Sequence, residues 1–150
     1  GLWIMADAAQ SFGGTYKGRK VGALAETTTT SFYPPKPLGC YGDGGAVFTE
    51  NKEIFEVLQS LRIHGQGNED KYKNIRIGIN GRMDTLQAAI LIEKLTLFSE
   101  ELSLRQTVAD RYSKGLANVA ITPYVAPDCQ SAWADRNRRP RSSRFGLRQG

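Results

Sequence analysis

Residues that build disulfide and metal sites are scarce in this sequence. The 150 residues include two cysteines and one histidine, and Cys40 and Cys129 lack the paired cysteine or histidine spacing of a zinc site. We therefore expect two free thiols and no metal centre. Apolar runs fall well short of the roughly 20 residues that a membrane-spanning helix needs, and no charged-then-apolar leader opens the chain. These absences predict a globular cytoplasmic protein with no membrane partner.

Lysine is absent from the end of the chain, residues 135–150, which contains six arginines and a single acid, Asp135. This tail carries the whole net charge of +5, so residues 1–134 are neutral. A neutral body argues against an electrostatic footprint for DNA or RNA, and we expect no nucleic-acid partner. The body uses lysine and arginine together, so we expect the arginine-rich tail to be disordered or out of frame. A native basic arm is the alternative.

Hydrophobic periodicity places strands and helices along one α/β domain. The hydrophobic content of 40% is enough for a core. The expected strands are 2–6, which reads as buried and ends at Asp7, the threonine-rich 25–33, 46–49, and a possible edge strand at 120–125. The expected helices are 51–62 and 82–114, separated by a long, ordered, polar loop with several glycines at 66–81.

Lys36 lies in an unusual setting for a surface lysine. Three prolines, Pro34, Pro35 and Pro37, surround it, and a glycine-rich turn follows at 42–45. Proline fixes its own φ and restricts the residue before it, so Lys36 is expected to sit in a stiff, extended loop. A positioned lysine suits Schiff-base chemistry, because desolvation or a neighbouring cation helps the amine lose its proton. The alternative is an ordinary solvated loop lysine.

Several short motifs acquire meaning through their order and spacing. They are Asp7-Ala8-Ala9-Gln10, Ser31, Lys36, Gly42-Asp43-Gly44-Gly45, Leu61-Arg62-Ile63-His64-Gly65 and Gly78-Ile79-Asn80-Gly81-Arg82-Met83-Asp84, followed by Gln87-Ala88-Ala89. Between about Met5 and Ala134 the chain resembles the DegT/DnrJ/StrS nucleotide-sugar aminotransferases, which are pyridoxal 5'-phosphate (PLP) enzymes of fold type I. The resemblance implies a PLP cofactor and a transferase that moves an amino group.

The resemblance assigns a role to each motif. Lys36 would form the Schiff base with PLP and act as the general base and acid of catalysis. Asp7 would face the pyridine nitrogen, where a carboxylate keeps the ring protonated. Gln10 would bond the cofactor's phenolic oxygen and Ser31 its phosphate. Without Lys36, Asp7 would read as a strand-end cap, and Gln10 and Ser31 as turn side chains bonded to backbone.

Two further residues follow from the same resemblance. Family members are dimers with shared active sites, in which an asparagine of the neighbouring subunit reaches the phosphate, and Asn80 matches that position. Arg82 would bind an anionic group of the substrate, because a guanidinium fits a carboxylate bidentately. The alternative for Arg82 is a helix-start residue paired with Asp84. His64 reads as a structural histidine.

The motifs around Lys36, His64 and Arg82 are similar to those of enzymes that aminate C3 of a UDP-linked 2-acetamido-3-oxo-glucuronic acid. The expected partners are therefore a nucleotide-sugar substrate and an amino-acid donor, glutamate in the family, in the biosynthesis of surface polysaccharides such as the lipopolysaccharide O-antigen. Other keto-sugars, aminated at C3 or C4, stay open. An inactive fragment or pseudoenzyme, or a PLP-dependent sugar dehydratase, is the alternative function.

The expected fold is a fragment of the fold type I large domain, a mixed and mostly parallel sheet with helices. We expect residues 1–81 to be the C-terminal part of the PLP-binding large domain and 82–117 a connecting helix. Residues 118–134 would then start a small α+β domain, followed by the tail at 135–150. Because the chain opens within an expected strand, we also expect its start to be missing.

Overall fold

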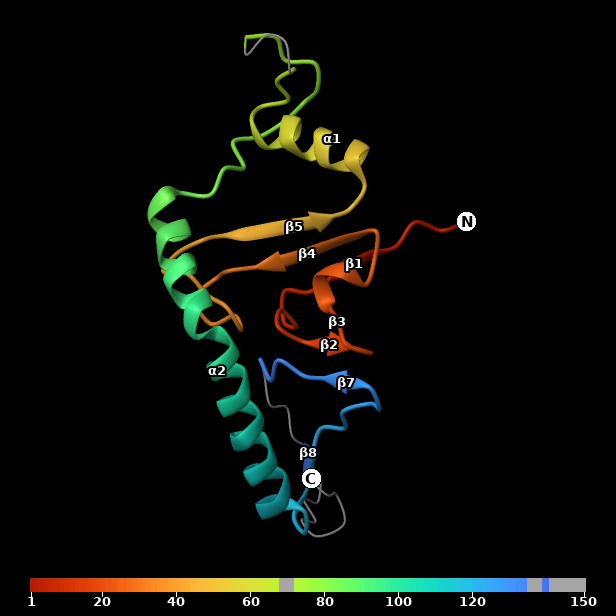
Figure 1. Cartoon of the computed structure of the whole chain (residues 1–150), viewed down its shortest axis with the longest axis vertical. Coiled ribbons are helices and arrows are strands. Elements are labelled where there is room, and N and C mark those ends of the chain that lie inside the picture. Colours follow the sequence, from red (N-terminus) through yellow and green to blue (C-terminus); the bar gives the residue numbers. More distant parts are fainter. Residues whose placement is uncertain (68–71, 135–138, 141–150) are drawn as a thin grey trace, which may run out of the picture.

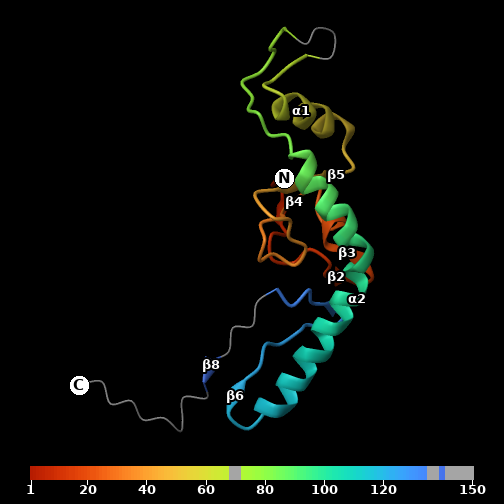
Figure 2. The ribbon, with the colours of Figure 1, turned by 90° about the vertical axis from the view of Figure 1, so that its left-hand side faces the viewer.

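The computed structural model describes residues 1–67, 72–134 and 139–140. A long helix, α2 (Thr85–Leu116), runs along one side of a small sheet and continues beside residues 120–134 (Figures 1 and 2). A shorter helix, α1 (Lys52–Arg62), lies at the end of the molecule where α2 begins. Neither helix is long and apolar enough to cross a membrane, and the same holds for every other helix that the structure describes.

The main sheet has three strands, β1 (Met5–Asp7), β4 (Thr27–Ser31) and β5 (Gly45–Thr49), in the order β1-β4-β5. β1 is parallel to β4, and β5 is antiparallel to β4. The β-branched threonines of β4 suit this central position. The expected mixed sheet is confirmed, but it is not mostly parallel among the described residues, because one of its two pairings is parallel and the other antiparallel.

The expectation of a buried first strand is wrong for this structure. β1 begins at Met5, and Leu2, Trp3, Ile4 and Met5 are 96%, 56%, 66% and 49% exposed. In the described part of the chain β1 pairs only with β4, so its other edge is open. The apolar residues 2–4 therefore precede β1 and are exposed, rather than forming part of a buried strand.

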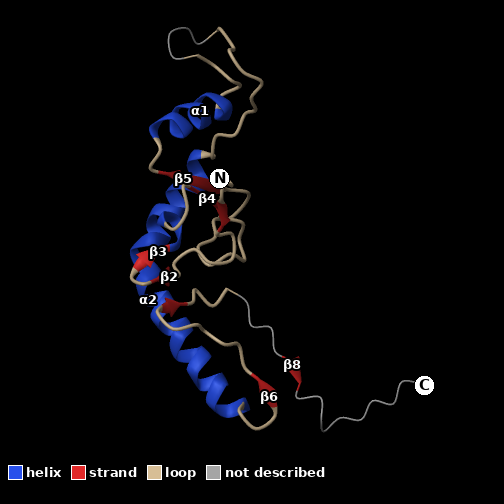
Figure 3. Cartoon of the chain, turned by 90° about the vertical axis from the view of Figure 1, so that its right-hand side faces the viewer, coloured by secondary structure: helices blue, strands red, loops and turns tan. Residues whose placement is uncertain are grey.

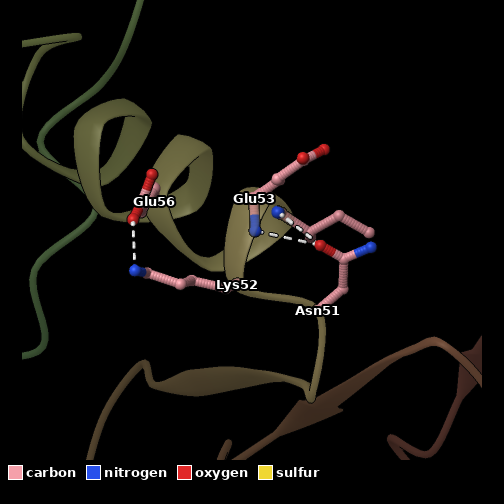
Figure 4. Close-up of polar contacts among 5 residues, drawn as sticks. Asn51, Lys52, Glu53 and Glu56 are labelled. Atoms are coloured by element: carbon pink, nitrogen blue, oxygen red, sulfur yellow. Dashed lines mark hydrogen bonds and ion pairs between the residues drawn. The ribbon is translucent and has the colours of Figure 1, made fainter.

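Helix α1 has a side-chain cap at its N-terminus. The side chain of Asn51 caps it, with Oδ1 accepting hydrogen bonds from the backbone N–H of Glu53 at 2.9 Å and of Ile54 at 3.2 Å (Figure 4). Glu53 in the first turn complements the helix dipole. Lys52 and Glu56 form an exposed ion pair at 3.8 Å, which contributes little because water screens it. The expected helix 51–62 is confirmed, with Asn51 as its cap.

The hydrophobic core lies between α2 and the loop that joins β4 to β5. Its buried members come from both segments: Phe32, Leu38, Cys40, Leu91 and Phe98. Phe12 packs against this cluster, with its ring centroid 5.6 Å from that of Phe98 and 5.9 Å from that of Phe32. At 1.5 Å per residue, the 32 residues of α2 span about 48 Å. The expected long helix is therefore present and unbroken, three residues later at its start than expected.

Short strands complete the structure beside α2 (Figure 3). β2 (Thr15–Tyr16) lies between β3 (Arg19–Lys20) and β7 (Cys129–Gln130), and β6 (Ala120–Ile121) pairs with β8 (Arg139–Pro140). A single 3-10 turn, η1 (Val21–Ala23), leads from β3 toward β4. The edge strand expected at 120–125 is limited to two residues, since Pro123 cannot extend it.

Residues near both ends of the chain share one sheet, because β7 pairs with β2 through Thr15 opposite Gln130. This pairing joins residues on both sides of the expected domain boundaries at 81 and 117, so the division into domains at 81, 117 and 134 stays a prediction. The expected disorder of the tail 135–150 concerns residues that, apart from 139–140, lie outside the described part. Cys40 and Cys129 are both free, as expected.

Candidate functional site

Polar residues gather at one edge of the main sheet. β1 and β4 are parallel and in register, with Asp7 opposite Thr29, so Asp7 and Ser31 both lie at the carboxyl ends of their strands. β5 starts at the same edge, where Gly45 lies opposite Ser31. The loop 32–44, which carries Lys36, leaves and returns at this edge. The carboxyl edge of a sheet is the usual place for ligands in α/β proteins.

Backbone hydrogen bonds and burial hold this loop in one shape. The N–H of Phe32 donates to Gly44 O, and the N–H of Cys40 donates to Phe32 O, both at 2.7 Å. The Lys36 N–H donates to Tyr33 O at 2.9 Å, which closes a turn over the two prolines. Lys36 itself is half-buried. The structure thus agrees with the stiff loop that the proline pattern predicts.

Buried side chains on the far side of Lys36 anchor the loop further. Leu38 is 2% exposed and Cys40 is fully buried. The Cys40 thiol lies 3.0 Å from Phe32 O and 3.1 Å from Gly42 O, so it bridges the two arms of the loop. Gly39 is packed so closely that an added Cβ would lie 2.3 Å from Pro34 O. Lys36 is therefore held between a proline turn and a buried, densely packed anchor.

The other residues expected at this edge have local contacts. Asp7 Oδ1 accepts a hydrogen bond from the Ala9 N–H at 2.9 Å, and Ser31 Oγ accepts one from the Tyr33 N–H at 3.2 Å. These are the backbone contacts that the alternative interpretation of each residue expects. Gln10 lies exposed in the turn that follows β1. Each side chain keeps polar atoms for a ligand, and cofactor contacts stay predictions for all three.

Asn80 and Arg82 lie on a different segment, which joins the end of α1 to the start of α2 (Figure 1). Arg82 Nε donates to Asn80 Oδ1 at 2.9 Å, and both residues are exposed. Within the described residues Arg82 forms no ion pair with Asp84, so that alternative is not found. The structure brings Asp7, Ser31 and Lys36 to one edge and leaves Asn80 and Arg82 outside it.

Two glycines fix this segment against α1. An added Cβ would lie 1.9 Å from Arg76 O at Gly65, and 2.2 Å from the Gly65 nitrogen at Gly78. Gly65 also has φ +77°, a conformation that glycine adopts without strain. The Ile79 N–H then donates to Leu61 O at 2.9 Å and the Gly81 N–H to Arg62 O at 2.8 Å. His64 belongs to this structural junction, and no metal-binding group occurs among the described residues.

The sequence analysis assigned no loop contact to three residues of α2 that bind the Lys36 loop, although one of them, Gln87, belongs to the family-like motif Gln87-Ala88-Ala89. Gln87 Oε1 accepts a hydrogen bond from the Tyr41 N–H at 2.8 Å. Lys94 Nζ donates to Gly39 O at 2.5 Å, and Arg105 Nη2 donates to Pro37 O at 3.3 Å. Their spacing of seven and eleven residues was the available signal, because it places all three on one face of a helix.

A pocket of about 950 Å³ lies apart from this site. Residues around η1, the end of β5 and the middle of α2 line it, among them Gly22, Phe48, Glu50 and Leu95. It includes no residue of the loop 32–44. The candidate site at the polar sheet edge is thus separate from this pocket.

Comparison with known proteins identifies the family. The DegT/DnrJ/EryC1/StrS aminotransferase family profile matches residues 1–139. The chain is 48% identical over 135 residues to the UDP-2-acetamido-2-deoxy-3-oxo-D-glucuronate aminotransferase of Pseudomonas aeruginosa, covering 89% of this chain and 37% of that protein. It is 42% identical over 135 residues to the dTDP-3-amino-3,4,6-trideoxy-alpha-D-glucose transaminase of Streptomyces venezuelae, covering 89% and 35%.

Solved structures agree on the fold. A DegT DnrJ EryC1 StrS aminotransferase from Brucella abortus superposes with a TM-score of 0.86 at 48% identity, covering 89% of this chain and 35% of that one. The expected α/β fragment of this fold is thereby confirmed. The chain spans little more than a third of the length of these relatives. Sequence, fold and motifs together lead to one conclusion: the chain belongs to the DegT/DnrJ/EryC1/StrS aminotransferase family.

Proposed function

We propose that this chain carries part of the cofactor site of a PLP-dependent aminotransferase that acts on a nucleotide-linked keto-sugar. One observation carries the proposal. The sheet edge brings the carboxylate of Asp7 and the hydroxyl of Ser31 to the base of the rigid loop that presents Lys36. Family membership adds the reaction class.

The chemistry of this set of residues fits PLP. The cofactor has an aldehyde, a basic ring nitrogen, a phenolic oxygen and a phosphate, and it supplies an electron sink when bound. Lys36 would hold it through the aldehyde, Asp7 would keep the ring nitrogen protonated, Gln10 would bond the phenolic oxygen, and Ser31 would bond the phosphate. Each polar group of the edge thus has a chemically suitable counterpart.

Lys36 also supplies the proton transfers of the proposed reaction. Its Nζ takes the proton from the amine-bearing carbon of the donor, for which we propose glutamate, and later gives a proton to the keto carbon of the sugar. The packed anchor of Leu38 and Cys40 limits the motion of the loop between these two steps. A restrained base is effective because it is already oriented toward the reacting carbon.

For the acceptor we propose a UDP-linked 2-acetamido-3-oxo-glucuronic acid, in the biosynthesis of amino sugars for surface polysaccharides. The 48% identity to the Pseudomonas aeruginosa enzyme of that name supports this choice. The exposed guanidinium of Arg82 would bind the uronate carboxylate, since it has donors left beyond its bond to Asn80.

We further propose that two copies pair and that Asn80 of one copy serves the phosphate site of the other. Asn80 and Arg82 lie outside the sheet edge of their own chain, as such an exchange requires. Ile75, Ile77 and Ile79, on the same segment, are 53%, 98% and 70% exposed. A second copy would cover this apolar surface.

The experiment is to add PLP to the purified chain, reduce with borohydride, and find the modified lysine by mass spectrometry. We expect one dominant adduct at Lys36 and its loss in Lys36→Ala. Lys52→Ala is the matched control, because Lys52 is an exposed helix lysine that should not affect the yield. Equal labelling of many lysines, or an unchanged adduct yield in Lys36→Ala, would refute the assignment.

A further inference from the structure

One face of α2 carries polar side chains that bind the backbone of the Lys36 loop. Gln87, Lys94 and Arg105 contact the backbone groups of Tyr41, Gly39 and Pro37 respectively. At 100° per residue, positions 94 and 105 lie within about 20° of position 87 around the helix. The three therefore form a single straight stripe, which we call the α2 polar stripe.

Each contact of the α2 polar stripe satisfies a group that the loop cannot satisfy by itself. The Tyr41 N–H and the carbonyls of Pro37 and Gly39 face the helix rather than a strand, and they have no backbone partner among the described residues. The two carbonyl contacts come from cations, and charge-assisted bonds are the stronger kind. Lys94 also lies 5.9 Å from the centroid of the Tyr41 ring.

The stripe lies beside the hydrophobic contacts of the same helix. Leu91 and Phe98 are 6% and 7% exposed and pack against the core formed with Leu38 and Cys40. Gln87, Lys94 and Arg105 are each half-buried at the border of that core. Hydrophobic packing thus holds the loop against α2, while the polar contacts fix the position of the loop backbone along the helix axis.

We propose that Gln87, Lys94 and Arg105 are positioning residues that set the place of Lys36 relative to the sheet edge. The inference rests on the proposed role of Lys36 as the lysine that binds the cofactor. The stripe contacts begin at Pro37, the residue after Lys36, and end at Tyr41. A loop released from α2 would keep its proline turn but would lose the contacts that fix its position relative to the sheet edge.

The first test needs no cofactor and measures amide hydrogen exchange of the chain. Gln87→Leu removes the acceptor of the Tyr41 N–H, and we expect that amide to exchange about fivefold faster, as for the loss of one ordinary hydrogen bond. Gln87→Glu keeps an acceptor oxygen and should restore protection to within about twofold. Exchange at Tyr41 that Gln87→Leu leaves unchanged, or a rise spread equally over β4 and β5, would overturn the positioning role.

The second test measures how fast Lys36 is trapped by PLP and borohydride. We expect Lys94→Met to slow the trapping at least threefold and Lys94→Arg to recover most of the rate, because arginine still donates to the Gly39 carbonyl. Lys114→Met, at an exposed lysine in the last turn of the same helix, is the matched control and should leave the rate unchanged.

The two tests separate the positioning role from the proposed function. If wild-type Lys36 is not trapped at all, the proposed function fails, whereas the exchange result still reports on the loop. If Lys36 is trapped equally fast in the wild type and in Lys94→Met, the proposed function stands and the positioning role is wrong.

Discussion

Gly39→Ala tests whether the Lys36 loop depends on close backbone packing. A Cβ at position 39 would lie 2.3 Å from Pro34 O and 2.8 Å from Tyr33 O, whereas real Cβ atoms essentially never come closer than 3.0 Å to a neighbour. Both atoms belong to the backbone of the turn that Lys36 closes, so no side chain can rotate away. The two arms of the loop must therefore separate by at least 0.7 Å.

The size of the effect follows from that separation. Forcing an extra carbon into a packed site costs about 1 to 3 kcal/mol of unfolding free energy, and rigid backbone neighbours favour the upper end. For a chain of this length, about 2 to 4 °C of Tm corresponds to each kcal/mol. We expect Gly39→Ala to lower Tm by roughly 5 to 10 °C and to slow PLP trapping at Lys36.

Thermal unfolding followed by circular dichroism, with PLP and borohydride trapping on the same samples, measures both effects. Gly22→Ala is the matched control, because its Cβ would meet the Phe48 ring at 3.5 Å, an ordinary contact, and should change stability by less than about 0.5 kcal/mol. If Gly39→Ala melts within 2 °C of the wild type and traps PLP at the same rate, the loop is not held by close packing.

The remaining predictions concern the cap of α1 and the substrate. Asn51→Ala removes the acceptor of two N–H groups and should lower the free energy of unfolding in urea by about 1 kcal/mol. The control Lys52→Ala removes an exposed ion pair and should lower it by less than about 0.5 kcal/mol. Equal losses in the two variants would contradict the capping role. Arg82→Met should raise KM for a uronate nucleotide-sugar about tenfold or more, with little change for the corresponding neutral sugar; equal losses would exclude a carboxylate contact.

Structural features that depend on residues close together in the chain were predictable from the sequence. The helical spacing of residues 51–62 predicts a helix there, and the structure has it at Lys52–Arg62 with Asn51 as its cap. The prolines around Lys36 predict a stiff loop, because their effect on the backbone is independent of tertiary context. These features could be inferred since each depends on residues close together in the chain.

Features that depend on distant partners were not predictable in the same way. The apolar run before Asp7 predicts burial, but exposure depends on which layers cover the strand, and residues 2–5 are exposed. Arg82 donates to Asn80 and forms no ion pair with Asp84 among the described residues, a choice between two near neighbours that their spacing does not decide. Lys94 contacts Gly39 O because the loop 32–44 packs against α2, and helical periodicity alone does not indicate that contact.

The α2 polar stripe has a consequence for how this protein can change in length during evolution. One residue inserted or deleted between Gln87 and Arg105 would rotate the rest of the helix by 100° and separate the loop contacts on the two sides of the change. Seven- or eleven-residue changes would keep the rotation but shift the contacts along the axis by whole turns. If the α2 polar stripe positions the loop as proposed, we expect length changes between Gln87 and Arg105 to disturb Lys36 more than changes beyond Arg105.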